Sequence, residues 1–390
     1  MRRRGSSRAL LLVSLCASVV GGCGAREALD IGAGAGSSRQ CPELEVTDVP
    51  ECTRASPEAL PLARLAELPG ETGGMDGWHL AADEAHLYFV SESRIFRVSK
   101  EGGEPEPLTP PHTAGQSLTL VGDFLYWWHE GWVRRMPVGG GPIEPALELP
   151  EADGWTVAPD AILSWQGSEY GAPLRSTSLS TGEATVLWAG ARQARIVGFR
   201  ADESHAYGLV GHDLLRVPLE GGAAELLGEG TDALSGWAAG GGLEWIVTDT
   251  HVYLGRASFE DVPVNEAGSF DPKIEVYRVA KESPHTAEQV VNRGFSLRMV
   301  EHEDDLFLDA VVRANEGPET RGEIVRVPLD GGEVERIGES DSASPALSSV
   351  YTNTSAGIAA SDCHVFVHLR CEDEDTYRLV ALPYGEEREE

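Results

Sequence analysis

The sequence is poor in basic residues and lacks the short motifs that mark common catalytic sites. It contains 31 Lys and Arg against 63 Asp and Glu, which gives a formal net charge of −32 at pH 7. So large a negative charge repels phosphate backbones and anionic lipid head groups. The composition therefore excludes nucleic acid as an expected partner. Cationic partners would be attracted, although acidic loops also simply keep an exposed protein soluble.

The motif search finds no D-x-D-x-D-G loop, H-E-x-x-H helix, G-x-S-x-G elbow or phosphate-binding loop. Only His364 and His368 share a four-residue spacing, which on a strand separates them by about 13 Å, too far for one metal ion. The acidic run at residues 372–375 and the cluster at residues 301–305 could bind calcium weakly, but solvated loop charge explains both. We expect no cofactor and no metal.

The N-terminal residues predict export. A basic stretch precedes an apolar run of 12 residues, Ala9 to Val20, which is too short to span a bilayer as a helix. We interpret residues 1–22 as a signal peptide. The sequence V-G-G-C that ends at Cys23 resembles the lipobox of bacterial lipoproteins, in which a small-residue motif precedes a lipidated cysteine. An ordinary secretory signal with an incidental cysteine is the alternative.

The lipobox resemblance implies a diacylglyceryl thioether on Cys23 and a location in the cell envelope, with the membrane contacted through the lipid anchor alone. Gly24 stands where such lipoproteins carry Asp when they stay in the inner membrane, so the outer membrane is favoured, on its periplasmic or surface face. Glycines and small polar residues follow as far as Ser38. Residues 23–60 therefore read as a flexible tether.

The rest of the chain is a repeat. A core of the form R-V-P-L-x-G-G recurs with spacings of 38, 41, 40, 62, 48 and 53 residues. It begins at Arg97, Arg135, Ser176, Arg216, Arg278 and Arg326 and recurs near Leu379. A period near 40 residues with four short strands per unit is typical of a β-propeller. We predict an all-β, seven-bladed β-propeller over residues 61–385, with six or eight blades as alternatives, and an acidic tail at 386–390.

Local chemistry agrees with this architecture. The alternation from His86 to Val90 suits a strand that is covered on both faces. The Gly-Gly pairs supply the positive φ angles that tight hairpins require. The last unit lacks a fourth strand, and an unassigned strand precedes the first unit. We predict that Leu62 to Leu68 pairs with Tyr377 to Leu382 and closes the ring, which removes open sheet edges.

Two stretches carry a family resemblance: HLYFVSESRIFRVSKEGGEPEPL from His86 and GDFLYWWHEGWVRRMPVGGGPIEPAL from Gly122. Over roughly Leu62 to Tyr384 the chain resembles the YWTD and TolB-like propeller repeats, whose units run D-x-L-Y-W, then I-x-R-V, then a glycine-containing turn. The resemblance implies the fold. It leaves the function open, because such propellers serve as receptors, periplasmic scaffolds, lyases and lactonases.

One set of aromatic residues is a candidate ligand site. Trp78, Trp155 and Trp237, each preceded by Gly, and Phe295 occupy the same place in different units, where the chain enters the innermost strand. In a propeller these positions surround one mouth of the central channel. The rings could stack on a glycan, a peptide or a side chain of a partner protein. Packing between blades as ordinary core is the alternative.

Loop lengths point to the same end of the molecule. The turn between the second and third strands is predicted to be long at 256–273, 313–322 and 370–376, in units five to seven, and short in units one, two and four. Long loops on a rigid scaffold often carry binding sites, although insertions also do least harm there.

These features favour a membrane-anchored binding or scaffold module with an unidentified protein, peptide or glycan ligand. A metal-dependent enzyme of the lactonase or lyase type is the alternative, ranked lower because the sequence offers no preformed ligand set. A purely structural envelope protein is a third hypothesis.

With Cys23 lipidated, four cysteines remain for disulfides: Cys41, Cys52, Cys363 and Cys371. An extended segment would hold Cys363 and Cys371 roughly 25 Å apart at about 3.3 Å per residue. Direct pairing needs α-carbons within about 7 Å. We therefore expect links from the tether to the last blade, and Cys52 with Cys363 is the preferred pair.

Overall fold

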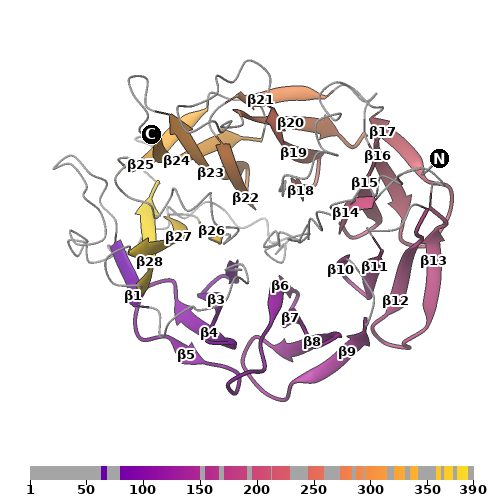
Figure 1. The fold of residues 1–390 in the computed structure, drawn as a ribbon, viewed down its shortest axis with the longest axis horizontal. Coiled ribbons are helices and arrows are strands. Elements are labelled where there is room, and N and C mark those ends of the chain that lie inside the picture. Colours follow the sequence, from indigo (N-terminus) through magenta and orange to yellow (C-terminus); the bar gives the residue numbers. More distant parts are fainter. Residues whose placement is uncertain are drawn as a thin grey trace, which may run out of the picture.

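The computed structural model describes fifteen stretches of the chain, which form 28 β-strands and no helix. The stretches are 63–67, 80–149, 154–166, 171–190, 196–211, 213–228, 245–258, 273–282, 287–292, 295–313, 320–329, 334–340, 357–361, 364–371 and 376–384. None of these stretches contains a helix that could cross a membrane. The strands build seven four-stranded antiparallel sheets. Figure 1 shows the sheets as blades around a common centre.

The first strand of each blade lies innermost. Blades 1 and 2 comprise β2 (Leu80–Ala82), β3 (His86–Ser91), β4 (Arg94–Ser99) and β5 (Glu106–Pro107), then β6 (Gln116–Val121), β7 (Phe124–His129), β8 (Trp132–Pro137) and β9 (Glu144–Glu148). Blades 3 and 4 comprise β10 (Gly154–Ala158), β11 (Ala161–Trp165), β12 (Leu174–Ser178) and β13 (Ala184–Trp188), then β14 (Ile196–Ala201), β15 (His205–Val210), β16 (Asp213–Pro218) and β17 (Glu225–Gly228).

The later blades follow the same order. Blades 5 and 6 comprise β18 (Trp245–Val247), β19 (His251–Ser258), β20 (Lys273–Ala280) and β21 (Glu288–Asn292), then β22 (Phe295–His302), β23 (Asp305–Arg313), β24 (Thr320–Pro328) and β25 (Glu335–Ser340). Blade 7 comprises β26 (Ile358–Ala360), β27 (His364–Cys371), β28 (Thr376–Pro383) and, as its outer strand, β1 (Ala63–Glu67). The predicted seven-bladed propeller is confirmed.

Each blade buries both of its faces against its neighbours. In blade 1, Leu87 and Phe89 pack with Phe366 of blade 7, whereas Tyr88, which lies between them on β3, packs with Trp127 of blade 2. Alternate side chains of a strand point to opposite faces, so one strand serves two interfaces. This explains why the strands read as nearly continuous apolar runs.

The ring closes as predicted. β1 pairs with β28 in antiparallel register, with Ala63 opposite Ala381 and Glu67 opposite Arg378. The chain therefore supplies the outer strand of its last blade from its N-terminal side. The Gly-Gly turns also have the predicted geometry, since Gly221 and Gly222 have φ angles of 90° and 140°.

Closure should contribute measurably to stability. We compare chains that begin at residue 61 and at residue 69, because only the second lacks β1. Four cross-strand pairs at about 0.2–1 kcal/mol each predict a loss of about 1–4 kcal/mol. Urea unfolding followed by circular dichroism measures the loss, and sedimentation should reveal self-association through the exposed edge of β28. Identical unfolding curves for the two chains would show that β1 contributes nothing to closure.

Candidate functional site

The strand order gives the propeller two unlike faces. The turns between first and second strands and between third and fourth strands lie on one face, which we term the turn face. The hairpins between second and third strands lie on the other, together with the starts of the inner strands, and we term it the hairpin face. The predicted aromatic site and the predicted long loops both belong to the hairpin face.

Two of the four predicted aromatic residues lie in described strands. Trp155 is the second residue of β10, and Phe295 is the first residue of β22. The Trp155 side chain is half-buried and packs against the apolar cluster between blades 2 and 3, which includes Tyr126 and Val157. Trp78 and Trp237 lie outside the described residues.

The glycine before Trp155 has a local structural reason. A β-carbon at Gly154 would lie 2.4 Å from the indole of Trp165, the residue opposite it on β11. Only glycine leaves room for that ring. Trp165 is 5% exposed and packs edge-on against Phe199 of blade 4.

Blade 5 has a tryptophan at the start of its inner strand that the motif search missed. Trp245 begins β18 and is 4% exposed. A β-carbon at Gly198 would lie 3.6 Å from its Nε1 and 4.0 Å from Cζ2 of Trp165, so both indoles pack around this glycine. The signal was available, because Trp245 precedes the turn at Thr248 as Leu80 precedes the turn at Asp83.

The hairpins of blades 5, 6 and 7 are longer than those of blades 1 to 4. Their second and third strands have eight or nine residues each, against five or six in the first four blades. Part of each predicted loop therefore belongs to paired β-strands. β23 and β24 pair as far as Arg313 and Thr320, which leaves residues 314–319 as the connection. β27 and β28 pair as far as Cys371 and Thr376.

Charge is layered along these three hairpins. The paired ends of the strands carry basic residues, and the connections 259–272, 314–319 and 372–375 contain ten acidic residues and no basic one. The basic positions are Arg256, Lys273, Arg313, Arg321, Arg370 and Arg378. The sequence of this part of the hairpin face therefore favours a cationic partner.

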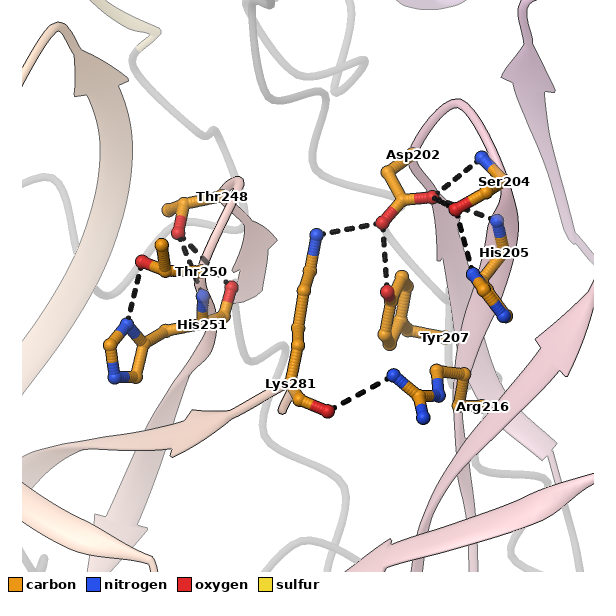
Figure 2. A network of polar contacts seen from close by, with 9 residues as sticks. All are labelled: Asp202, Ser204, His205, Tyr207, Arg216, Thr248, Thr250, His251 and Lys281. Carbon is orange, nitrogen blue, oxygen red and sulfur yellow. Dashed lines mark hydrogen bonds and ion pairs between the residues drawn. The ribbon is translucent and has the colours of Figure 1, made fainter. Parts of the chain in front are cut away.

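The turn face carries a polar network that joins blades 4 and 5 (Figure 2). Lys281, in the turn after β20, places its Nζ 2.7 Å from Oδ2 of Asp202, and the two side chains are 6% and 11% exposed. Asp202 also accepts hydrogen bonds from the backbone N–H groups of Ser204 and His205 and from the Tyr207 hydroxyl. Both carboxylate oxygens are thus engaged: Oδ1 accepts hydrogen bonds within blade 4, and Oδ2 joins blade 4 to blade 5 through Lys281.

The network shifts two pKa values in opposite directions. Burial alone would raise the pKa of Asp202, but hydrogen bonds from Lys281, Ser204, Tyr207 and His205 hold that pKa far below its usual range. Burial, and then the hydrogen bond to Asp202, raise the pKa of Tyr207. At neutral pH the carboxylate is ionised and the phenol is protonated, so neither group is poised for proton transfer.

The same turn, between the first and second strands, recurs in other blades with different residues. In blade 1, Asp83 accepts from the N–H groups of Ala85 and His86 and from the Tyr88 hydroxyl. In blade 5, Thr248 takes this place, and Leu329 of blade 6 stands where Lys281 stands in blade 5. The Asp202–Lys281 pair is therefore one version of a repeated contact between blades.

An arginine on the third strand adds a second contact between blades. Its guanidinium donates to the carbonyl oxygen three residues beyond the equivalent arginine of the next blade. The bonds run from Arg97 to Val138 at 3.5 Å, from Arg216 to Lys281 at 3.0 Å and from Arg278 to Leu329 at 3.1 Å. Each arginine also pairs with a glutamate on its own outer strand.

The metal and disulfide predictions are not tested by the structure. His364 begins β27 with a buried side chain, and Cys371 ends the same strand. Cys23, Cys41, Cys52 and Cys363 lie outside the described residues. Within the described stretches no group of three or more His, Cys, Asp or Glu is placed to hold a metal ion.

The acidic cluster predicted at residues 301–305 is spread over the turn between β22 and β23. Asp305 pairs with Arg326 at 2.6 Å. Glu303 and Asp304 are exposed. The described geometry fits the interpretation as solvated loop charge for these two residues.

No model of a known protein family matches the sequence, and no curated protein matches it. Solved structures align with this chain at low identity. The tricorn protease aligns at 13% identity and a TM-score of 0.49, over 79% of this chain and 33% of the protease. A puromycin-hydrolyzing peptidase from Mycobacterium tuberculosis aligns at 14% and 0.45, over 73% of this chain and 47% of the peptidase.

The N-terminal domain of Nup159 aligns at 11% identity and a TM-score of 0.42, over 83% of this chain and 95% of that domain. The chain spans about a third of the tricorn protease and about half of the peptidase. Likenesses this distant carry no information on function.

Breaking the ion pair should destabilise the propeller. Lys281→Met leaves Asp202 ionised and buried without its countercharge, so we expect a loss of about 3 kcal/mol in the free energy of unfolding. The double variant Asp202→Thr with Lys281→Leu introduces the residues that blades 5 and 6 use, and it should recover most of that loss. Urea unfolding measures both. A double variant as unstable as the single one would refute the equivalence of the two interfaces.

The ion pair also predicts a pH dependence. The folded pKa of Asp202 lies below its unfolded value of about 3.9, so its stabilisation is complete above that pH and is lost as the pH falls toward the folded pKa. Between about pH 5 and pH 2, the wild type should lose more stability than the double variant. Parallel curves of unfolding free energy against pH would contradict the assignment.

Proposed function

We propose that this chain is a lipid-anchored binding or scaffold module of the bacterial cell envelope, and that the hairpin face of blades 5 to 7 is its binding surface. The carrying observation is the set of three adjacent hairpins that extend beyond those of the other blades on a closed ring. A ring closed by β1 and β28 places the paired strands of these three hairpins in neighbouring blades, which favours their acting as one surface.

Charge supports this surface. The connections at the ends of the three hairpins are acidic, and the whole chain carries a net charge of −32. The ligand we propose is a protein or peptide segment with basic residues, steered to the hairpin face by this field. The half-buried Trp155 and the other channel-mouth aromatics would supply the apolar contact.

The anchor is the second part of the proposal. Cleavage after Gly22 would leave Cys23 as the acylated N-terminal residue, and residues 23–60 would serve as the tether of a propeller related to the YWTD and TolB-like repeats. The outer membrane is the proposed location. The tether would let either face of the ring meet a partner.

Affinity capture from an envelope extract tests the binding surface. The bait is the chain immobilised through its N-terminus. One variant has residues 313–320 replaced by Asn-Gly, which joins the cross-strand pair Val312 and Arg321 by a two-residue turn. A second variant is Trp155→Ala. The matched control carries Glu101→Lys and Glu220→Lys, exposed residues of turn-face turns.

We expect the trimmed variant to retain less than about a tenth of the wild-type ligand, and the turn-face control to retain nearly all of it. Thermal unfolding of each bait distinguishes lost contact from lost structure. Equal retention by the wild type and the trimmed variant would refute the hairpin face of blade 6 as part of the site. A large stability loss in Trp155→Ala would assign that ring to the core.

A further inference from the structure

The outer strand of blade 3 lacks the charged residues and prolines that the other outer strands carry, although its pairing with β12 shifts register after Val186. An outer strand presents unpaired N–H and C=O groups, and charged residues or proline on it discourage pairing with another chain. All seven outer strands lie within the described residues. Six carry such residues: Glu106 and Pro107 in β5, Glu144, Pro145 and Glu148 in β9, Glu225 in β17, Glu288 in β21, Glu335, Arg336 and Glu339 in β25, and Arg64 and Glu67 in β1. β13, with the sequence ATVLW, has none.

Blade 3 has also lost the ion pair that joins third and outer strands elsewhere. In blades 1, 2, 4, 5 and 6 an arginine and a glutamate stand opposite each other across this pair of strands and lie 2.5 to 3.5 Å apart. In blade 3 the same positions hold Ser176 and Thr185. β13 itself therefore carries no charged side chain, and the nearest charge across the ladder is Arg175 of β12, which is exposed opposite Val186.

The strand is held firmly at one end and is open at the other. Leu187 is buried, and Trp188 packs against Phe199 of blade 4. Ala184, Thr185 and Val186 are exposed. At 51%, Val186 is the one large apolar side chain of the described residues that is exposed.

The backbone of this open half points outward. Glu183 accepts a hydrogen bond from the N–H of Ser178 on the third strand, so its carbonyl faces inward. Backbone groups alternate in direction along an antiparallel strand. Ala184 therefore directs its own N–H and C=O groups away from the blade, where another strand can reach them, and Val186 occupies the next outward position, just before the register shift. In Figure 1, β13 lies on the outer rim of the ring.

We infer that β13 is a strand-addition site that takes an extended, β-branched segment of a partner protein flanked by basic residues. Backbone hydrogen bonds would supply affinity, and Val186 would supply apolar contact. Charge selects this occupant at the start of the strand: Glu183 is exposed there, the exposed Arg175 opposite Val186 lies further along the ladder, and the chain carries a net charge of −32. A second copy of the chain would bring the same negative charge, so self-pairing is disfavoured.

A fluorescent peptide, KKVTVTVK, tests the site by polarisation against the full-length chain. The matched peptides are EEVTVTVE, which reverses the charge, and KKVTPTVK, in which proline interrupts the strand. Val186→Lys places a charge on the edge, and Gln289→Lys makes the same kind of change on the exposed side of β21 in blade 5. Both changes are on exposed residues, and thermal unfolding checks that each variant is folded.

We expect KKVTVTVK to bind the wild type and Gln289→Lys alike, and Val186→Lys to bind it about tenfold more weakly. The charge-reversed and proline peptides should bind the wild type at least about tenfold more weakly. Equal binding to Val186→Lys, or equal binding of the proline peptide, would mean general electrostatic adsorption and would overturn the proposal. A concentration-dependent dimer that Val186→Lys abolishes would assign the edge to self-pairing and would also overturn it.

This site is independent of the hairpin face. β13 belongs to blade 3, whose second and third strands have five residues each, and the trimmed hairpin variant changes only blade 6, whereas Trp155→Ala lies in β10 on the inner side of blade 3. Failure of one proposal therefore leaves the other standing.

Discussion

Every blade of this protein has two apolar faces, and only neighbouring blades can cover both. Leu87 and Phe89 face one neighbour while Tyr88 faces the other, and the same alternation repeats around the ring. A free end would leave one such face in water. The pairing of β1 with β28 is thus the constraint on which the rest depends, because it fastens the last blade to the part of the chain that leads into the first.

Polar contacts refine this apolar arrangement. In the turn between the first and second strands, a carboxylate or hydroxyl accepts hydrogen bonds from backbone N–H groups, as Asp83, Asp202 and Thr248 show. In blade 4, Asp202 also forms a buried ion pair with Lys281 of blade 5. A buried pair costs desolvation and becomes favourable only when its remaining hydrogen bonds are made, and those of Asp202 all are. The hydrogen bonds of Asp202 therefore offset part of the desolvation that this buried pair costs.

The fold could be predicted from the sequence because each repeat of the pattern lies within a short segment of the chain. The R-V-P-L-x-G-G core marks a third strand and its turn, and the spacing of those marks gives the blade count. The residues of the candidate site were predicted less completely. Trp245 was missed because Glu244, not glycine, precedes it, so it lacks the Gly-Trp pattern of Trp155. The loop predicted at 313–322 also included residues of the ladder, which runs as far as Arg313 and Thr320. The Asp202–Lys281 contact joins residues far apart in the chain, which no local pattern reveals.

The arginine contacts between blades all run the same way round, from one blade to the carbonyl oxygen of the next. These hydrogen bonds therefore give the ring a rotational direction. Blade 3 has Ser176 in place of the arginine, so it cannot make this hydrogen bond to blade 4. A circular permutation with new termini between blades 3 and 4 would therefore separate no blades that this hydrogen bond joins, and the natural termini could be connected through a linker.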